Sequence, residues 1–210
     1  MQLTGETKFF IAVAVITIAI LIGAVFFLSK PPVEISAEKL TPPSVLGTGP
    51  DQPKAVLVEF ADFECPACGS AYPIVKEIVA SHKDSLRYVF RHFPLDQHKS
   101  ARLAAESAEA AGAQGKFWEM HSLLFENQSD LSREHIASLA AQLELNMDKF
   151  NKELTEGTYN EKIQKDINDG SSVGVNSTPT FFLNGKKLSL FNFEQLKTEV
   201  DKAIAASPQK

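Results

Sequence analysis

The chain has 210 residues and a formal net charge of −5, with 44% hydrophobic and 22% charged residues. A chain of this length can bury the core of one ordinary domain and still carry additional segments. The acidic balance argues against a nucleic-acid-binding protein, because such proteins need a basic surface to neutralise phosphates.

The sequence contains two cysteines, Cys65 and Cys68, separated by two residues. Two cysteines are too few for a small fold held together by disulfides. A Cys-x-x-Cys pair can also be half of a zinc site, but structural zinc needs four ligands and there is no second cysteine pair. We therefore expect no metal and read the pair as a chemical centre.

Residues 9–28 form an apolar run without charge. Twenty residues at helical rise span about 30 Å, the thickness of a bilayer's hydrocarbon core. We predict a retained transmembrane helix preceded by a short tail, residues 1–8. A cleaved signal peptide is the main alternative, although its apolar core is usually about 7–15 residues long. A buried helix is the other alternative. The short tail favours a cytoplasmic N-terminus, with the following domain outside.

Residues 29–53 are predicted to form a linker, because they hold six of the eleven prolines. Proline-rich segments are extended and fairly stiff, at about 3.1 Å per residue. The last part of this segment, around residues 45–47, is a candidate edge strand of the next domain.

A buried strand is predicted for Ala55–Ala61, followed by a helix that starts at Cys65. Glu59 interrupts the apolar strand, and a buried acid is costly unless it is paired or functional. A second strand is predicted for Leu86–Phe93, which ends before Pro94.

Residues 97–171 are predicted to be a helical block, with Ser132 and Asn146 as N-caps of two of its helices. Two further strands, 180–183 and 187–190, are joined by the turn Asn184-Gly185. A final helix covers residues 193–205. This order predicts an α/β fold. Residues 54–96 and 172–210 would form its core domain and 97–171 an inserted helical domain.

The position of the cysteine pair explains its chemistry. Cys65 would face the unpaired N–H groups at the start of a helix, which favour the reactive thiolate. Cys68 lies one turn further and can resolve a mixed disulfide. Pro66 suits the first helical position, where its missing N–H is not needed. An inert structural disulfide is the alternative, but so short a loop gives little stabilisation.

Two features oppose strong activation of Cys65. Asp62 and Glu64 place negative charge just before it, which disfavours the thiolate if they lie close in space. Ala67 supplies neither a hydrogen bond nor a positive charge. We therefore predict a moderately lowered pKa for Cys65.

Three segments together carry a family resemblance: residues 58–68, 91–95 and 174–185. In order and spacing they closely resemble the DsbA-like thioredoxin family. The resemblance implies a thioredoxin-like fold with an inserted helical domain, here preceded by the predicted transmembrane helix.

The resemblance also implies roles for individual residues. Cys65 matches the attacking cysteine, Cys68 the resolving one, and Glu59 the buried acid that relays protons to the second cysteine. Pro179 matches the cis-proline opposite the active site, where a free Thr178 backbone could pair with an extended substrate. Together with these two residues, the dipeptide Pro66-Ala67 is the predicted substrate contact. The alternatives are a partly exposed edge-strand acid for Glu59 and an ordinary loop for Thr178-Pro179.

The dipeptide between the cysteines departs from the family pattern. The best-known oxidases of the family have Pro-His there, whereas this chain has Pro66-Ala67. The missing imidazole removes one stabiliser of the reduced form. We expect a reduction potential between about −120 mV, the value of the strong oxidase, and about −270 mV, that of thioredoxin.

The leading interpretation is a membrane-anchored thiol–disulfide oxidoreductase that acts on cysteines of exported proteins. It would work on the periplasmic or extracellular side of the cytoplasmic membrane, with the Cys65–Cys68 disulfide as its only redox group and a membrane redox partner. An oxidase is slightly favoured over a reductase or isomerase. The alternative from another class is a membrane-tethered chaperone or assembly partner with incidental cysteines.

Overall fold

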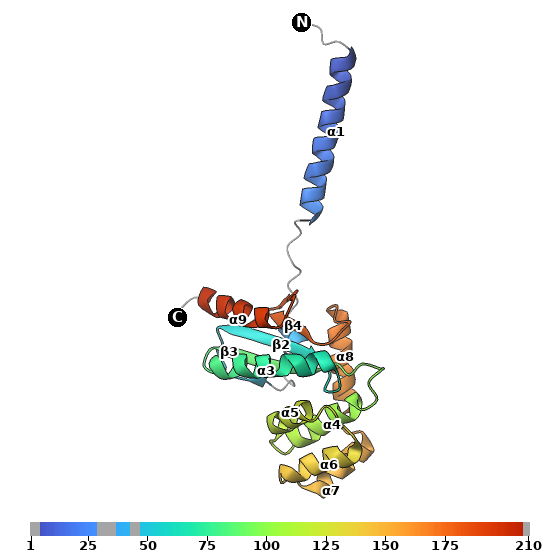
Figure 1. Cartoon of the computed structure of the whole chain (residues 1–210), viewed down its shortest axis with the longest axis vertical. Helices are drawn as coiled ribbons and strands as arrows, with labels where there is room; N and C mark the ends of the chain where they lie inside the picture. The colour runs from blue at the N-terminus through green and yellow to red at the C-terminus, as the bar shows by residue number, and fades with distance from the viewer. Residues whose placement is uncertain (1–4, 29–36, 43–46, 208–210) are drawn as a thin grey trace. The chain divides into compact units, whose positions relative to one another are not determined.

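The computed structural model describes residues 5–28, 37–42 and 47–207, and the chain divides into two units, Met1–Val33 and Glu34–Lys210. In the first unit, helix α1 (Gly5–Leu28) covers the predicted apolar run (Figure 1). Within the part of the chain that the structure describes, no helix combines the length and hydropathy required to cross a membrane. The predicted transmembrane segment includes side chains outside the described residues, such as those of residues 24–28.

A five-stranded sheet forms the centre of the second unit, with strand order β1-β3-β2-β4-β5. The strands are β1 (Gly47–Thr48), β2 (Ala55–Ala61), β3 (Leu86–His92), β4 (Thr180–Leu183) and β5 (Lys186–Lys187). The central pair, β2 and β3, is parallel, and the other neighbours are antiparallel. The mixed sheet confirms the predicted α/β class.

Helices surround this sheet (Figure 1). They are α2 (Ala37–Leu40), α3 (Pro66–Ser81), α4 (Ala101–Gly112), α5 (Phe117–Glu126), α6 (Arg133–Gln142), α7 (Met147–Glu156), α8 (Asn160–Ser172) and α9 (Glu194–Ala206). Figure 1 shows α4, α5, α6 and α7 grouped together, away from β2 and β4.

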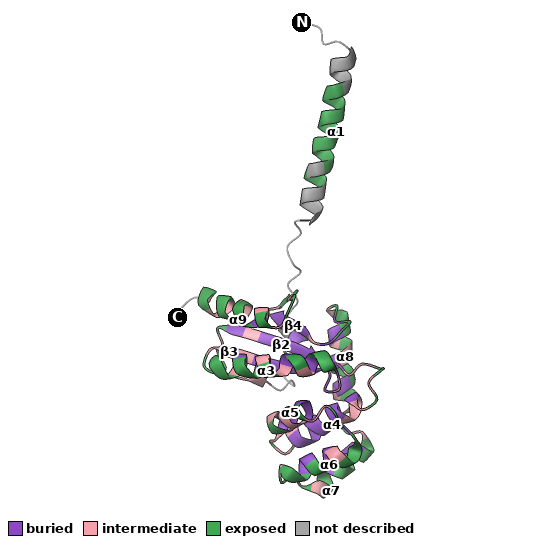
Figure 2. Ribbon diagram, viewed as in Figure 1, coloured by how far each residue is buried: buried purple, intermediate pink, exposed green. Residues whose placement is uncertain are grey.

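Two apolar cores lie on the two faces of the sheet. The larger one joins the sheet to α3, α9 and the helices of the block, and it includes both cysteines. The smaller one contains Leu40 of α2, Phe60 of β2 and Phe182 of β4, with Ile167 of α8 packed against it. Figure 2 shows that β2 and β4 are largely buried, whereas much of the outer surface of α9 is exposed.

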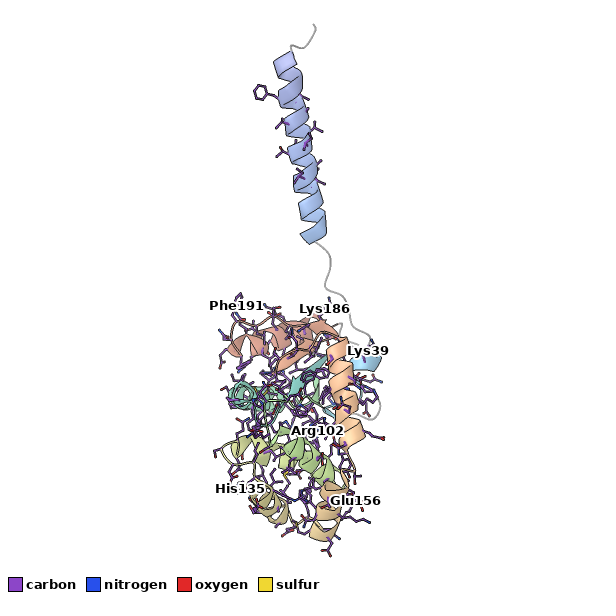
Figure 3. All side chains as sticks on the ribbon, turned by 90° about the vertical axis from the view of Figure 1, so that its right-hand side faces the viewer. Lys39, Arg102, His135, Glu156, Lys186 and Phe191 are labelled. Carbon is purple, nitrogen blue, oxygen red and sulfur yellow. The ribbon has the colours of Figure 1, made fainter. Side chains whose placement is uncertain are left out.

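The helical block follows the local signals in the sequence. The Ser132 side chain accepts a hydrogen bond from the His135 N–H, and Asn146 accepts one from the Lys149 N–H, so both predicted N-caps are confirmed. Helix α8 is linked to α4 by Arg102, labelled in Figure 3, which donates to Asn160 and Gln164. The limits of the inserted domain stay a prediction.

The predicted strand over 187–190 is wrong in length, because β5 ends at Lys187. Asn184 and Gly185 have φ values of 49° and 80°, as expected for a tight hairpin turn. Phe182 pairs with Lys187, so residue 190 would stand opposite Pro179, which has no N–H to donate. The pairing between β4 and β5 therefore ends before residue 190.

Part of the predicted linker contacts the domain. Leu40 is 1% exposed, and the Arg91 guanidinium donates to the carbonyl oxygens of Lys39 and Leu40 at 2.9 and 3.1 Å. Residue pairs Gly47–Val89 and Thr48–Tyr88 make β1 the edge strand next to β3. Residues 29–36 and 43–46 of the predicted linker lie outside the described residues.

Candidate active site

The cysteine pair lies at the start of α3, where it was predicted. Cys65 is the N-cap residue, with extended backbone angles, and Pro66 is the first residue of the helix. The Cys65 N–H donates to the carbonyl of Asp62, which closes the turn between β2 and α3. Both cysteines are free thiols; Cys65 is 7% exposed and Cys68 is fully buried.

The two thiols differ strongly in acidity. The pKa of Cys65 is lowered to about 5, chiefly by a hydrogen bond with the Cys68 thiol, while its partial burial acts in the opposite direction. The backbone at Cys68 and Ala67 also favours the thiolate. Burial raises the pKa of Cys68 far above its ordinary value. Cys65 is therefore suited to attack a disulfide, as predicted, while Cys68 needs a base.

Asp62 and Glu64, the two acids before Cys65, both have hydrogen-bond partners. This changes the expectation that their negative charges disfavour the Cys65 thiolate. The Asp62 carboxylate accepts hydrogen bonds from the N–H groups of Glu64 and Leu95, and it lies 2.7 Å from Nδ1 of His98. Burial lowers the pKa of His98, but the Asp62 contact outweighs it, so the net shift is upward. The negative charge of Asp62 thus lies next to an imidazole whose protonated form it favours.

His98 was not singled out from the sequence. It belongs to the segment after β3, and only the fold brings that segment to the Asp62 turn. The Ser100 N–H makes a parallel contact, donating to the carboxylate of Glu64 at 2.6 Å.

Glu59 lies in the central strand β2 and is 2% exposed, so the alternative of an edge-strand acid is wrong. The Tyr88 hydroxyl donates to its Oε2 atom at 2.6 Å. Burial raises the pKa of Glu59 to about 7, although the Tyr88 hydrogen bond acts in the opposite direction. The charge of Glu59 also contributes to the raised pKa of Cys68, so the two groups interact.

Thr178 and Pro179 lie beside the attacking cysteine. The peptide bond between them is cis, as predicted. The Cys65 thiol lies 3.5 Å from the Thr178 carbonyl oxygen, to which it donates. Among the described residues, the buried hydroxyl of Thr178 has no hydrogen-bond partner. Pro66 and Ala67 are exposed at the same end of α3.

Gln128, which follows α5, also contacts the site and was not predicted from the sequence. Its side-chain nitrogen donates to the carbonyl oxygens of Phe63 at 2.6 Å and Cys65 at 3.0 Å. The helical block thus holds the turn that carries the attacking cysteine.

Within the described part of the chain, no group of three or more His, Cys, Asp or Glu residues could hold a metal ion. The site combines an acidic thiol, a buried second thiol and a buried carboxyl group that can exchange a proton near neutral pH. This set defines a class of protein that carries out thiol–disulfide exchange.

Comparisons with known proteins agree with this class. A family model described as thioredoxin matches residues 43–202. The chain therefore belongs to the thioredoxin family. DsbA2 of Pseudomonas aeruginosa is 27% identical, with a TM-score of 0.60 over 74% of this chain and 92% of that chain.

Two other solved structures are more similar in shape. A thioredoxin-like oxidoreductase from Silicibacter pomeroyi DSS-3 has a TM-score of 0.72 at 24% identity, covering 82% of this chain and 99% of that chain. BdbD from Bacillus subtilis has a TM-score of 0.69 at 22% identity, covering 83% and 98%. These identities show the shared fold. The predicted resemblance to DsbA-like thioredoxin proteins is confirmed.

Two relatives found by sequence are longer proteins, and only part of each one matches this chain. A Na(+)/H(+) antiporter NhaA 3 of Salinispora tropica is 42% identical over 161 residues, which are 76% of this chain and 24% of that protein. A second relative, Na(+)/H(+) antiporter NhaA 1 of Salinispora arenicola, is 41% identical over 161 residues. The chain spans about a quarter of the length of these relatives.

Proposed function

We propose that this protein exchanges disulfides with cysteines of exported proteins through the pair Cys65 and Cys68, with oxidation slightly favoured over reduction or isomerisation. The observation that carries the proposal is the position of the Cys65 thiol. It lies at the helix N-terminus, 3.5 Å from the Thr178 carbonyl, with a lowered pKa. The redox-active disulfide is the only redox group that this chemistry requires.

In the oxidising direction, a substrate thiolate attacks Cys65 of the disulfide. The Cys65–Cys68 bond breaks, Cys68 leaves and takes a proton from Glu59, and a mixed disulfide forms. A second substrate thiolate then attacks the substrate sulfur of that bond and releases Cys65 as a thiolate. The substrate loses two electrons and the cysteine pair gains them. A membrane partner that donates a disulfide would restore the oxidised pair.

Substrate binding is proposed for the surface around Cys65. The backbone of Thr178 can pair with an extended substrate segment, as an added strand pairs with a sheet edge. The Thr178 carbonyl lies beside the Cys65 thiol, and the exposed dipeptide Pro66-Ala67 follows Cys65 directly in the chain. These contacts would orient a substrate disulfide or thiol toward Cys65.

Oxidation of reduced ribonuclease and reduction of insulin test the activity, with Cys65→Ser as the control. We expect the wild type to accelerate at least one of these reactions and the variant to accelerate neither. Equal behaviour of both proteins in both assays would favour the tethered-chaperone alternative. Thiol trapping in cells tests the direction: a pair found mainly as the disulfide supports an oxidase, and a mainly reduced pair contradicts it.

We also propose that the apolar segment of residues 9–28 anchors the protein in the cytoplasmic membrane, with the catalytic domain outside. Its length and lack of charge support this. The membrane-bound protein should resist alkaline carbonate extraction. Complete release into the soluble fraction would rule out the anchor.

A further inference from the structure

A pocket of about 340 Å³ lies beside α3, and neither Thr178 nor either cysteine is among its lining residues. Exposed Lys76 and Ala80 of α3 form part of its lining, together with the buried residues Val75, Tyr88 and His121. The pocket therefore extends from the protein surface to the sheet. None of its lining residues belongs to the predicted substrate contacts.

Tyr88 connects this pocket to the proton-exchanging group. Its hydroxyl donates to Oε2 of Glu59 at 2.6 Å, and its side chain lines the pocket. In the parallel pairing of β2 and β3, Tyr88 stands opposite Leu57, so Tyr88 and Glu59 are diagonal neighbours. Glu59 itself is 2% exposed, so its direct access to bulk water is small.

The pocket also offers a polar group to water. His121 is 4% exposed, and its Nε2 atom has no hydrogen-bond partner among the described residues. Its pKa is lowered to about 3 by burial and by nearby positive charge, so the ring is neutral at physiological pH. A buried polar atom without a protein partner is usually satisfied by water. A water molecule here would lie in the same pocket as Tyr88.

Thiol–disulfide exchange requires that Cys68 can gain and lose a proton. When Cys65 is bound to a protein substrate, the substrate covers the end of α3 where Cys65 and Thr178 lie. In that state Cys68 must lose or gain a proton through Glu59. The proton then has to leave or enter by a path that the substrate does not block.

We propose that Tyr88 and the pocket beside α3 form the proton route between Glu59 and solvent, an inference that rests on the proposed exchange function. In the reducing direction, Cys68 gives its proton to the Glu59 carboxylate as its sulfur attacks Cys65 of the mixed disulfide. The Cys65–Cys68 bond forms, the bond between Cys65 and the substrate sulfur breaks, and the substrate leaves as a thiolate. Protonated Glu59 then donates to the Tyr88 oxygen while Tyr88 releases its own proton to water in the pocket. Glu59 ends as the carboxylate, Tyr88 is unchanged, and the proton leaves as hydronium. The oxidising direction runs the same path in reverse.

Other titratable groups face this route. Cys68, Tyr72 and Lys76 come from α3, and His121 comes from α5. Tyr72 is bound to Glu126 through its hydroxyl at 3.1 Å, and Lys76 pairs with the same carboxylate. The route therefore depends on the Tyr88 hydroxyl.

Two variants test the route separately. Tyr88→Phe removes the hydroxyl and keeps the ring. Ala80→Phe places a larger side chain at an exposed position of the pocket lining and keeps the Tyr88 hydroxyl that donates to Glu59. The matched controls are Tyr159→Phe, a tyrosine beside α8, and Ala141→Phe, an exposed alanine of α6.

The readout is the lifetime of the mixed disulfide formed with a disulfide-linked peptide, followed by acid quench and intact mass between pH 5 and pH 8. At pH 7 both test variants should prolong this lifetime by about tenfold, within the range expected for loss of assisted proton transfer. Formation of the mixed disulfide and both controls should stay within about twofold of wild type.

Suppose that either test variant resolves the mixed disulfide as fast as wild type while Glu59→Gln resolves it slowly. This result would overturn the proton route but would leave the proposed function standing. A wild-type protein that never forms the mixed disulfide would instead refute the proposed function. If Tyr88→Phe has no cooperative thermal transition, the lifetime in Ala80→Phe decides the question alone.

Discussion

The carboxyl group of Glu59 has a pKa of about 7, because burial penalises its charged form more than the Tyr88 hydroxyl stabilises it. In the unfolded chain the same group ionises near 4.5. The folded state therefore holds a proton that the unfolded state releases between these two values. Stability from this residue is fully present below about pH 4.5 and is lost as pH rises to about 7.

This linkage predicts the effect of Glu59→Gln, which keeps the shape and removes the charge. The variant should be more stable than wild type at pH 8 by about 3 kcal/mol, the equivalent of the pKa shift. The difference should shrink toward zero near pH 4. Urea unfolding at both pH values measures it. The exposed residue Glu134 provides the control, since Glu134→Gln should change little at either pH.

The same variant should lose function while gaining stability. Without the Glu59 carboxylate, Cys68 keeps its proton and resolves mixed disulfides more slowly, by about tenfold or more at pH 7. A variant that is less stable at pH 8, or as fast as wild type, would contradict the assigned role of Glu59.

The acidity of Cys65 depends on its neighbour. The largest cause of its lowered pKa is the hydrogen bond with Cys68. Cys68→Ala should therefore raise the Cys65 pKa from about 5 toward the ordinary value of 9.0, as measured by thiolate absorbance in the ultraviolet. An unchanged midpoint would show that the helix N-terminus alone sets the acidity. A wild-type midpoint near 3.5 would show that activation is as strong as in a strong oxidase.

At the scale of elements, the helical block and α3 meet at Gln128. Besides its two bonds to Phe63 and Cys65, the Gln128 side chain fills the space beside Gly69. A Cβ atom at Gly69 would lie 2.0 Å from Gln128 Oε1. An alanine there must therefore displace Gln128 and break its hydrogen bonds.

A double-mutant cycle tests this contact. Gln128→Ala should destabilise the fold by about 1–3 kcal/mol, because two carbonyl oxygens lose their donor. Gly69→Ala alone should be destabilising for the same reason. In the Gln128→Ala background, however, Gly69→Ala should be neutral or stabilising, since alanine is the better helix former. Additive free energies of unfolding would mean that the two residues do not interact.

Elements with a strong local signal were predictable from the sequence. The alternating and apolar runs of β2 and β3 were found, and so were the caps Ser132 and Asn146. Contacts between distant segments carry no such signal. Arg91, placed within a predicted strand, is fully buried and binds Asp166 and Asp169 of α8 at 2.8 and 2.7 Å.

The residues of the candidate site also differ in whether the sequence alone could identify them. Cys65, Cys68 and Glu59 were identified by spacing and by an acid within an apolar strand. Thr178 and Pro179 were identified only through the family resemblance, because nothing local links them to Cys65. His98, Gln128 and Tyr88 required the fold, since each acts on the site from a different segment.

For the whole molecule, the central claim is that Cys65 and Cys68 form a redox centre of intermediate oxidising strength. Its thiolate is stabilised by the helix N-terminus and by Cys68, which favours the reduced pair and makes the disulfide oxidising. The dipeptide Pro66-Ala67 lacks an imidazole between the cysteines, which limits this effect. Among the relatives of this chain are longer proteins named as antiporters, of which the matched sequence makes up 24%.

Equilibration of the purified protein with glutathione buffers tests this claim most directly, with alkylation and intact mass reporting the fraction of Cys65–Cys68 disulfide. We predict one two-electron transition with a midpoint between about −120 mV and about −270 mV. A pair that stays reduced or oxidised in every buffer, or a midpoint outside this interval, would contradict it.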